Sequence, residues 1–333
     1  MTRSPRVLLS RILRAYRSAR IRLGQPAAPI VTVPGTPPAD DPAPGEATGF
    51  DGARAFDLLR LQCAQGPRIP GTPGHTATRD LLLRELSRWA DEVAVQEWRQ
   101  PVARGPGAGR TFPMTNLFAL LRGTADRDTP AERIRPELMV CAHWDTRPVA
   151  DQDPDPAKRS HPVPGANDGA SGAAVVLELG RALRARRPAG SVAFALWDGE
   201  DLGEYYYGSR LYSGVCGRPG YARWRPRRAV LLDMVGKKGL RCTTETHSIL
   251  YAPRLWDEVH RAADRLGLDR HFHGPVRGIM DDHVFLNRAG IPSVVLIDYA
   301  YPHWHTTGDT VDECAPESLQ AVGDVLLRFV EDA

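Results

Sequence analysis

Residues 293–297 have the sequence Ser-Val-Val-Leu-Ile, and residues 229–232 have the sequence Ala-Val-Leu-Leu. Short apolar runs of this kind are typical of strands that are buried on both faces of a sheet. The same interpretation extends to the other strand-like segments, which are 92–98, 116–121, 138–142, 191–196 and 228–233. Amphipathic helical patterns separate or flank them, at 53–64, 75–89, 171–186, 253–266 and 316–330. This alternation predicts an α/β fold, a three-layer α/β/α sandwich with a mixed, largely parallel central sheet.

The chain divides into three parts by composition. Residues 1–24 are rich in arginine, and residues 25–49 are rich in Pro, Gly and Ala without a helical or strand period. The second composition is typical of an extended, poorly ordered linker. We therefore expect an N-terminal extension (1–24) that is able to form a helix, a linker (25–49) and one folded domain (50–333).

Charge is distributed unevenly along the chain. Residues 1–39 contain seven arginines and no acid, whereas the net charge of the whole chain is +3, so the remainder carries about −4. This negative charge excludes nucleic-acid binding through a basic surface of the main domain. No stretch approaches the ~20 consecutive apolar residues of a transmembrane helix. Residues 3–23 would place Leu8, Ile12 and Leu23 on one helical face, which allows contact with a membrane surface, although a solvated extension is the favoured interpretation.

Cysteine usage and the N-terminal sequence indicate the compartment. The five cysteines are scattered and form no CxxC pair, so they fit reduced thiols better than a disulfide framework. The longest apolar run of the Arg-rich segment, at residues 7–9, is too short for the core of a secretory signal. We therefore expect a cytoplasmic protein without a signal peptide.

Acidic and imidazole side chains follow four of the predicted strands. In chain order, the strand ends are followed by His143, by Glu200 and Asp201, by Asp233 and by His305. Asp168 stands just before the helix at 171–186. Because ligands bind outside the carboxyl ends of the strands in such sheets, we expect these side chains to gather at one edge.

The residue types at this edge indicate a metal. Carboxylates mixed with imidazoles, without a thiolate, suit a catalytic Zn²⁺ site that keeps one position open for substrate. The neighbours Glu200 and Asp201 point in different directions, so one is able to bind the metal while the other transfers protons. Any one of these acids alone is more often a helix cap or a surface group, so the prediction depends on their joint occurrence.

Several motifs resemble one enzyme group. They are GPRIPGTPGH (66–75), CAHWDTRPVADQDPDP (141–156), PGANDGASGAAVVLELGRAL (164–183), LWDGEDLGE (196–204), LLDMVGKK (231–238), MDDHVFLNRAGIPSVVLIDY (280–299) and WHTTGDT (304–310). In combination, they resemble the M28 zinc-peptidase superfamily and, within it, the zinc-dependent glutaminyl-peptide cyclotransferases of animals and bacteria. The resemblance covers about residue 53 to the C-terminus and implies the fold of the zinc aminopeptidases.

The resemblance implies a metal centre and a proton shuttle. Asp168, Asp201 and His305 correspond to the ligands of one Zn²⁺. Asp201 stands where the superfamily usually has Glu, although a cyclotransferase-like bacterial subgroup also carries Glu-Asp here. Glu200 corresponds to the catalytic acid/base.

The resemblance also implies which residues lie on the substrate side of the site. Asp233 and Asp282 correspond to two acids of a hydrogen-bond network beside the metal, and Trp304 corresponds to an aromatic wall of the substrate pocket. The implied reaction converts an N-terminal glutamine to pyroglutamate and releases ammonia. The implied partner is therefore a peptide or small molecule with a free N-terminal glutamine.

Two alternatives stay open. In the aminopeptidase branch, His143 and Asp233 would hold a second zinc ion, with Asp168 bridging the two ions, and every one of these residues is present. Trp304, the segment 281–283 and the loop RPVADQDPDP favour the cyclotransferase. The third possibility is a catalytically silent relative that binds peptides, and the complete set of acids argues against it.

Overall fold

The central sheet lies within the part of the chain that the computed structural model describes, residues 28–33 and 49–332. In these residues the large sheet has seven strands in the order β1-β2-β3-β5-β4-β6-β9. The bounds are β1 Ile30–Val33, β2 Glu92–Pro101, β3 Thr111–Leu121, β4 Leu138–His143, β5 Val192–Trp197, β6 Ala229–Asp233 and β9 Ser293–Ile297. A separate two-stranded sheet pairs β7 (Thr244–Glu245) with β8 (Val276–Arg277).

The half of the large sheet that contains β5, β4, β6 and β9 is parallel. The pairs β1–β2, β2–β3 and β3–β5 are antiparallel, so the sheet is mixed. Every residue of β4, β5, β6 and β9 is buried, as the apolar runs predict for strands covered on both faces. The predicted α/β fold is confirmed.

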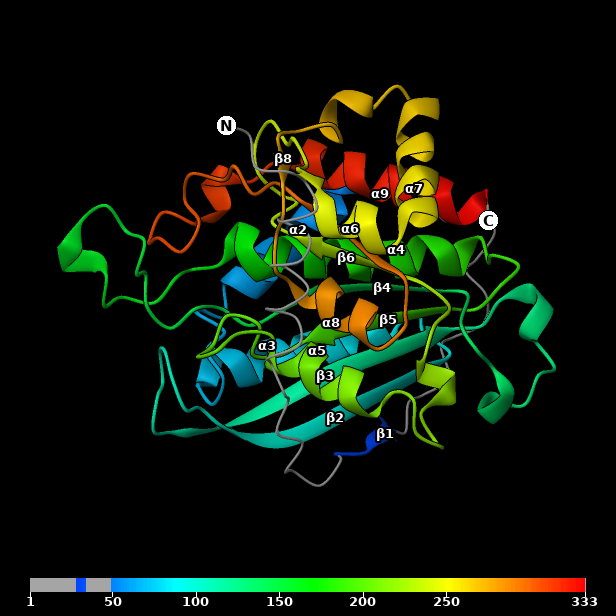
Figure 1. The fold of residues 1–333 in the computed structure, drawn as a ribbon, viewed down its shortest axis with the longest axis horizontal. Helices are drawn as coiled ribbons and strands as arrows, with labels where there is room; N and C mark the ends of the chain where they lie inside the picture. The colour runs from blue at the N-terminus through cyan, green and yellow to red at the C-terminus, as the bar shows by residue number, and fades with distance from the viewer. Residues whose placement is uncertain (1–27, 34–48, 333) are drawn as a thin grey trace, which may run out of the picture.

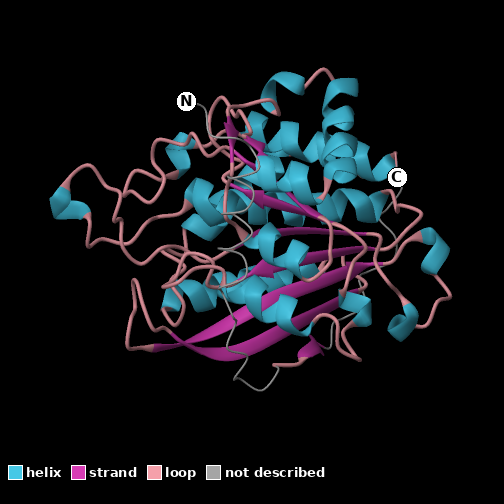
Figure 2. Cartoon of the chain, viewed as in Figure 1, coloured by secondary structure: helices cyan, strands magenta, loops and turns pink. Residues whose placement is uncertain are grey.

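Helices cover both faces of this sheet (Figures 1 and 2). One face packs on α2 (Gly52–Cys63), α3 (Pro73–Ser87), α4 (Gly172–Ala185), α7 (Pro253–Arg265) and α9 (Pro316–Glu331). The other face packs on α5 (Tyr207–Val215) and α8 (Asp282–Arg288), while α6 (Thr246–Tyr251) contacts β9. Alternate residues of each strand point to opposite faces, so Val140 belongs to the first core and Met139 to the second.

The helices that the sequence predicts are all present, with bounds that differ by at most two residues. Local signals explain their starts. Asp51 caps α2 by accepting the backbone N–H of Arg54 at 3.0 Å, and Thr72 caps α3 by accepting that of His75 at 3.3 Å. The helices α5, α6 and α8 were not predicted. They have six to nine residues, too few to repeat an amphipathic period clearly.

The prediction that residues 25–49 lack regular structure is wrong at β1. Residues 30–33 pair antiparallel with β2 at the edge of the sheet, in register Ile30 with Gln96. Val31 is 54% exposed, and the other three residues are also at least partly exposed. The strand lies at the edge of the sheet and is held mainly by backbone pairing. Its sequence, Ile-Val-Thr-Val, is a run of four β-branched residues typical of a strand, although the surrounding segment has the composition of a linker.

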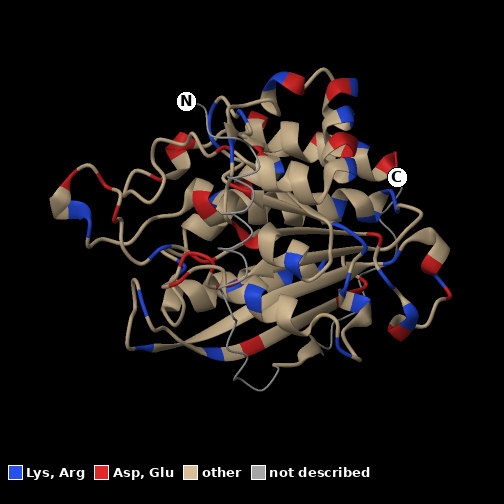
Figure 3. Cartoon of the chain, in the orientation of Figure 1, with Lys and Arg blue, Asp and Glu red and all other residues tan. Residues whose placement is uncertain are grey.

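The Arg-rich extension and the rest of the linker lie outside the described residues, and so does the proposed membrane contact of residues 3–23. Among the described helices, none is long and apolar enough to span a membrane. Basic and acidic residues are interspersed over the outer helices and loops in the view of Figure 3.

Candidate active site

The carboxyl edge of the parallel strands brings the predicted residues together. His143 is the last residue of β4 and Asp233 is the last residue of β6. Glu200 and Asp201 lie in the turn after β5, and His305 lies in the loop after β9. Asp168 lies in the irregular turn Ala166–Ser171 that leads into α4. Clustering at this edge, which the sequence predicts, is what the structure shows.

One set of three side chains has the geometry of a metal site. Asp168, Asp201 and His305 each offer one ligand atom within 4.8 Å of the others. His305 Nε2 lies 2.9 Å from Asp201 Oδ1 and 3.6 Å from Asp168 Oδ2. Asp168 Oδ2 and Asp201 Oδ2 are buried and lack a hydrogen-bond partner among the described residues. Two carboxylates and one imidazole with spare oxygens fit a catalytic Zn²⁺.

A second set shares Asp168 with the first. His143, Asp168 and Asp233 also offer ligand atoms within 4.8 Å of one another. His143 Nε2 lies 3.1 Å from Asp168 Oδ1 and 3.2 Å from Asp233 Oδ1. The two oxygens of Asp168 thus face the two sets separately, as a bridging carboxylate would require. The residues of this site therefore fit two neighbouring cations as well as one.

The buried carboxylates of the cluster repel one another, so a positive charge between them would be stabilising. Burial raises the pKa of Asp168 to about 6, and the charge of Asp201 acts in the same direction. Burial also raises the pKa of Glu200 well above its usual value, helped again by Asp201. For Asp201, burial acts upward, but the charge and hydrogen bond of His305 outweigh it and hold the pKa below its usual value. A divalent cation would offset the repulsion among these buried acids.

Two further acids hold the ligand-bearing turns through their backbone. Asp145 accepts the N–H groups of Glu200 at 3.0 Å and Asp201 at 3.2 Å. Asp309 accepts the N–H groups of Asn167 at 2.8 Å and Asp168 at 3.1 Å. The sequence interpretation gave neither acid a role. Their only sequence signal is spacing, two residues after His143 and four after His305.

Arg68 supports the turn that leads to Asp168. Its fully buried guanidinium donates to the carbonyl oxygens of Trp144 at 3.2 Å, Pro164 at 2.7 Å and Gly165. Gly165 has a φ of 70°, and a Cβ there would lie 2.2 Å from the Thr146 methyl group. Only glycine fits this left-handed position without displacing its neighbours. Arg68 belongs to the GPRIPG motif, which the sequence interpretation used only for the resemblance.

A pocket of about 290 Å³ opens beside the metal-site residues. Its lining combines acids with aromatic and apolar side chains: Asp168, Glu200, Asp201, Tyr205, Tyr206, Asp233, Met234, Gly278, Ile279, Met280, Asp281, Ile297, Tyr299, Trp304 and His305. Trp304, predicted as a wall, stacks on the His305 ring with centroids 4.0 Å apart. Tyr205 stacks in parallel with the same imidazole, at 6.3 Å and 9°. The pocket is therefore a small slot with aromatic walls.

The structure separates two adjacent acids that the sequence could not distinguish. Asp281 lines the pocket, whereas Asp282 lies outside its lining. Asp282 is fully buried and accepts a hydrogen bond from the Ser209 hydroxyl. Asp281 Oδ1 accepts the N–H of Asp282 at 2.6 Å, and Asp281 Oδ2 is buried without a hydrogen-bond partner among the described residues. Burial, followed by the charge of Asp233, raises the pKa of Asp281 well above its usual value.

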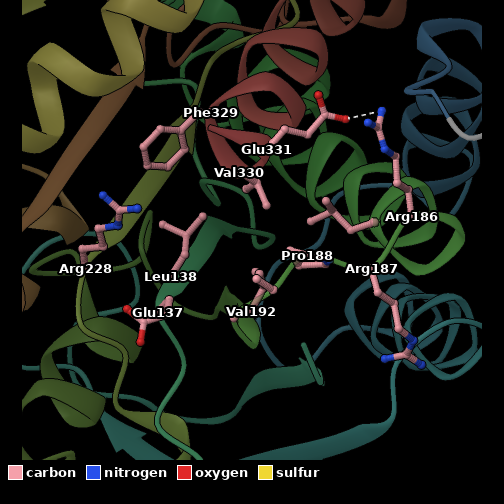
Figure 4. Close-up of a pocket in the computed structure, with 13 residues that line it drawn as sticks. Glu137, Leu138, Arg186, Arg187, Pro188, Val192, Arg228, Phe329, Val330 and Glu331 are labelled. Atoms are coloured by element: carbon pink, nitrogen blue, oxygen red, sulfur yellow. Dashed lines mark ion pairs between the residues drawn. The ribbon is translucent and has the colours of Figure 1, made fainter. Parts of the chain in front are cut away.

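A larger hollow of about 350 Å³ lies at the opposite edge of the sheet, where β4 and β5 begin (Figure 4). Leu138 and Val192 line it, with arginines around them. These arginines already have acidic partners: Arg186 pairs with Glu331 and Arg187 with Asp91, both at 2.7 Å, and Arg228 pairs with Glu258. Among the described residues, the sets of side chains able to hold a metal do not include any residue of this lining.

The fold and the site together are those of an α/β protein with a buried cluster of carboxylates and imidazoles that fits a divalent cation. A family model described as peptidase family M28 matches residues 123–330, and the chain belongs to this family. The resemblance that the sequence motifs indicated is confirmed. Membership of this family implies zinc, and a probable zinc metalloprotease of Leptosphaeria maculans is 35% identical to the chain over 218 residues.

Relatives of two activities resemble the chain. The solved structure of Fimbriiglobus ruber glutaminyl cyclase is 30% identical, with a TM-score of 0.76 over 90% of this chain and 100% of that one. A Zn-dependent exopeptidase from Parabacteroides distasonis is 28% identical, with a TM-score of 0.75 over 86% and 99%. Aminopeptidase YwaD of Bacillus subtilis is 29% identical over 209 residues, which are 59% of this chain and 41% of that protein. The chain thus spans less than half of that curated relative.

Proposed function

We propose that this chain is a zinc-dependent glutaminyl-peptide cyclotransferase, which converts an N-terminal glutamine to pyroglutamate and releases ammonia. The observation that carries the proposal is the small pocket in which Trp304 stacks on the candidate ligand His305. Such a slot suits one folded side chain whose two ends must react with each other. The likeness to a glutaminyl cyclase over that protein's whole length supports the same reaction.

The proposed zinc ligands are Asp168, Asp201 and His305. A Zn²⁺ ion bound there would act as a Lewis acid and polarise the γ-carboxamide carbonyl group of the substrate. The α-amine nitrogen then forms a bond to the γ-carboxamide carbon, and the bond from that carbon to the amide nitrogen breaks. Glu200, which lines the pocket but is outside this ligand set, takes a proton from the attacking amine and returns it to the departing ammonia.

The remaining pocket residues orient the substrate. Asp281 and Asp282 each have one buried carboxylate oxygen without a hydrogen-bond partner among the described residues, but Asp281 alone of the two lines the pocket, and we propose that it, rather than the predicted Asp282, binds the α-amine. Asp233 lies beside it and also lines the pocket. Asp282 then supports this wall from behind through Ser209. Trp304 packs against the glutamine side chain and favours the folded conformer.

The alternative function is that of a di-zinc aminopeptidase. It is favoured by one observation, the position of His143 Nε2 at 3.1 Å and 3.2 Å from Asp168 and Asp233. In that case a second ion would bind between these residues, and Glu200 would act as the base for a water nucleophile.

Two measurements on the purified protein distinguish the two reactions. We expect ammonia release from Gln-initiated dipeptides, little hydrolysis of Leu or Ala p-nitroanilide, and one zinc per chain. Rapid anilide hydrolysis without ammonia release, with two zinc ions per chain, would establish the aminopeptidase instead. Absence of both activities in zinc-loaded protein would indicate the silent relative.

We also propose that the catalytic unit is the predicted domain 50–333 together with β1, with residues 1–24 as an extension and the other residues of 25–49 as a linker. The cytoplasmic location stays a prediction from the cysteine pattern.

A further inference from the structure

One wall of the pocket is a short segment without helix or long strand, residues 278–281. This wall contains Asp281, so its position fixes where that carboxylate lies. Tyr206 holds it from the pocket side, because the Tyr206 hydroxyl donates to the carbonyl oxygen of Met280 at 2.5 Å. Tyr206 itself has a left-handed backbone conformation with a φ of 61°.

A fully buried acid, Glu245, holds the same wall from behind. Glu245 Oε1 accepts the backbone N–H of Ile279 at 2.9 Å, together with that of His247 at 2.9 Å. His247 Nδ1 in turn lies 2.9 Å from the carbonyl oxygen of Ile279, to which it donates. Both backbone polar groups of Ile279 are therefore hydrogen-bonded, the N–H group to Glu245 and the carbonyl oxygen to His247.

The second oxygen of Glu245 contacts two helices. Glu245 Oε2 accepts the N–H and the hydroxyl of Ser248 at 2.6 Å and 2.9 Å, at the start of α6. It also lies 3.1 Å from His283 Nε2, in the first turn of α8. A single carboxylate thus connects α6 to the pocket wall and to α8, through residues that lie 34 and 38 positions after Glu245.

Glu245, His247 and His283 have ligand atoms close enough together for a metal ion. Their hydrogen bonds point to a different role. The imidazole atoms that face Glu245 or Ile279 act as donors, and a donor nitrogen carries the proton that a metal would have to displace. Both carboxylate oxygens already accept bonds from backbone N–H groups. The cluster is a hydrogen-bonded support.

We propose that Glu245 is a positioning residue, which sets the pocket wall 278–281 and thereby the placement of Asp281 against the substrate. Glu245 does not line the pocket, so it acts only through this wall. Replacing one of its two carboxylate oxygens by an NH₂ group would leave the donors that face that oxygen without an acceptor, and the wall would move to satisfy them. The inference rests on the proposed function only in that this pocket binds the N-terminal residue of the substrate.

The test compares full-length Glu245→Gln and Glu245→Asp with the matched control Glu258→Gln, which changes a partly exposed glutamate of α7. Zinc content, kcat and KM are measured for Gln-initiated dipeptides. We expect E245Q to keep its zinc and to raise KM roughly tenfold, the factor that corresponds to losing one ordinary hydrogen bond, with a smaller change in kcat. E245D should have a KM between those of E245Q and the wild type, and E258Q should have the KM of the wild type.

A merely structural role predicts a different result. E245Q would then lower Tm but leave the KM of the folded protein unchanged, and that outcome overturns the proposal. If E245Q fails to fold, Glu245→Asp decides, because it keeps the carboxylate and shortens the side chain by one methylene group without altering the pocket lining. A several-fold rise in KM supports the positioning of the wall, and an unchanged KM contradicts it.

A second readout does not depend on the reaction. Hydrogen exchange of the Ile279 amide should accelerate in E245Q, while exchange in the turn around Asp168 stays as in the wild type. Unchanged exchange at Ile279 overturns the inference even if the wild type releases ammonia. Accelerated exchange supports it even if the wild type proves to be an aminopeptidase, which separates the failure of this inference from the failure of the proposed function.

Discussion

Replacing Glu200 by Gln should remove catalysis without removing the metal. Glutamine has nearly the same shape as glutamate, and the bond from the backbone N–H of residue 200 to Asp145 does not involve the side chain. The candidate ligands Asp168, Asp201 and His305 stay intact. The substitution therefore deletes the proton-transferring carboxylate and little else.

The size of the effect follows from the role of Glu200. General acid–base catalysis contributes about 10²- to 10⁴-fold, so kcat should fall by that factor, which corresponds to a rise of about 2.7–5.5 kcal/mol in the activation free energy. Stability should not fall, because burial and the charge of Asp201 disfavour the Glu200 carboxylate, and its ion pair to His143 Nδ1 is a long one at 4.0 Å. KM should change less than kcat, since the walls of the pocket are unaltered.

The assay is coupled ammonia release from a Gln-initiated dipeptide, with zinc measured on the same preparation. Glu204→Gln is the matched control, because Glu204 lies on the same loop, is exposed, does not line the pocket and has a long ion pair with Arg104, at 3.7 Å. Loss of zinc from E200Q would show that Glu200 is a ligand and that the roles of Glu200 and Asp201 are misassigned. Retention of activity within about threefold would refute its role as the proton shuttle.

Three further predictions test the wall, the core and the buried acid. Asp281→Asn should raise KM for Gln-initiated peptides at least tenfold, which corresponds to the loss of about one charged hydrogen bond. Asp282→Asn should act mainly on stability, and equal effects of the two variants on KM would contradict the assignment. Gly180→Ala puts a Cβ 2.3 Å from the Trp89 ring and should lower the free energy of unfolding by about 1–3 kcal/mol in urea titrations. Burial raises the pKa of Glu245, but hydrogen bonds from two histidines outweigh it and hold the pKa far below its usual value. Its stabilising effect is therefore complete above its unfolded pKa of about 4.3 and is lost as the pH falls further, so the difference in unfolding free energy between wild type and E245Q should shrink below about pH 4.

Much of the fold was predictable from the sequence because its signals are local. A buried strand such as β9 needs apolar side chains on both faces, and α4 needs them at every third or fourth position. The residues of each element are therefore sufficient to predict it. The edge strand β1 has a shorter signal, four β-branched residues within a Pro-rich segment, and its pairing with β2 depends on backbone groups that every residue possesses.

The candidate site divides in the same way. The sequence by itself determined which residue types follow the parallel strands, and therefore that Asp168, Asp201 and His305 would meet at one edge, because parallel strands all end on the same side. Only the tertiary structure decided that Asp281 faces the pocket while Asp282 turns toward Ser209. The physical reason is that adjacent side chains at a helix start point in different directions, and the packing of distant segments selects which of them meets the substrate.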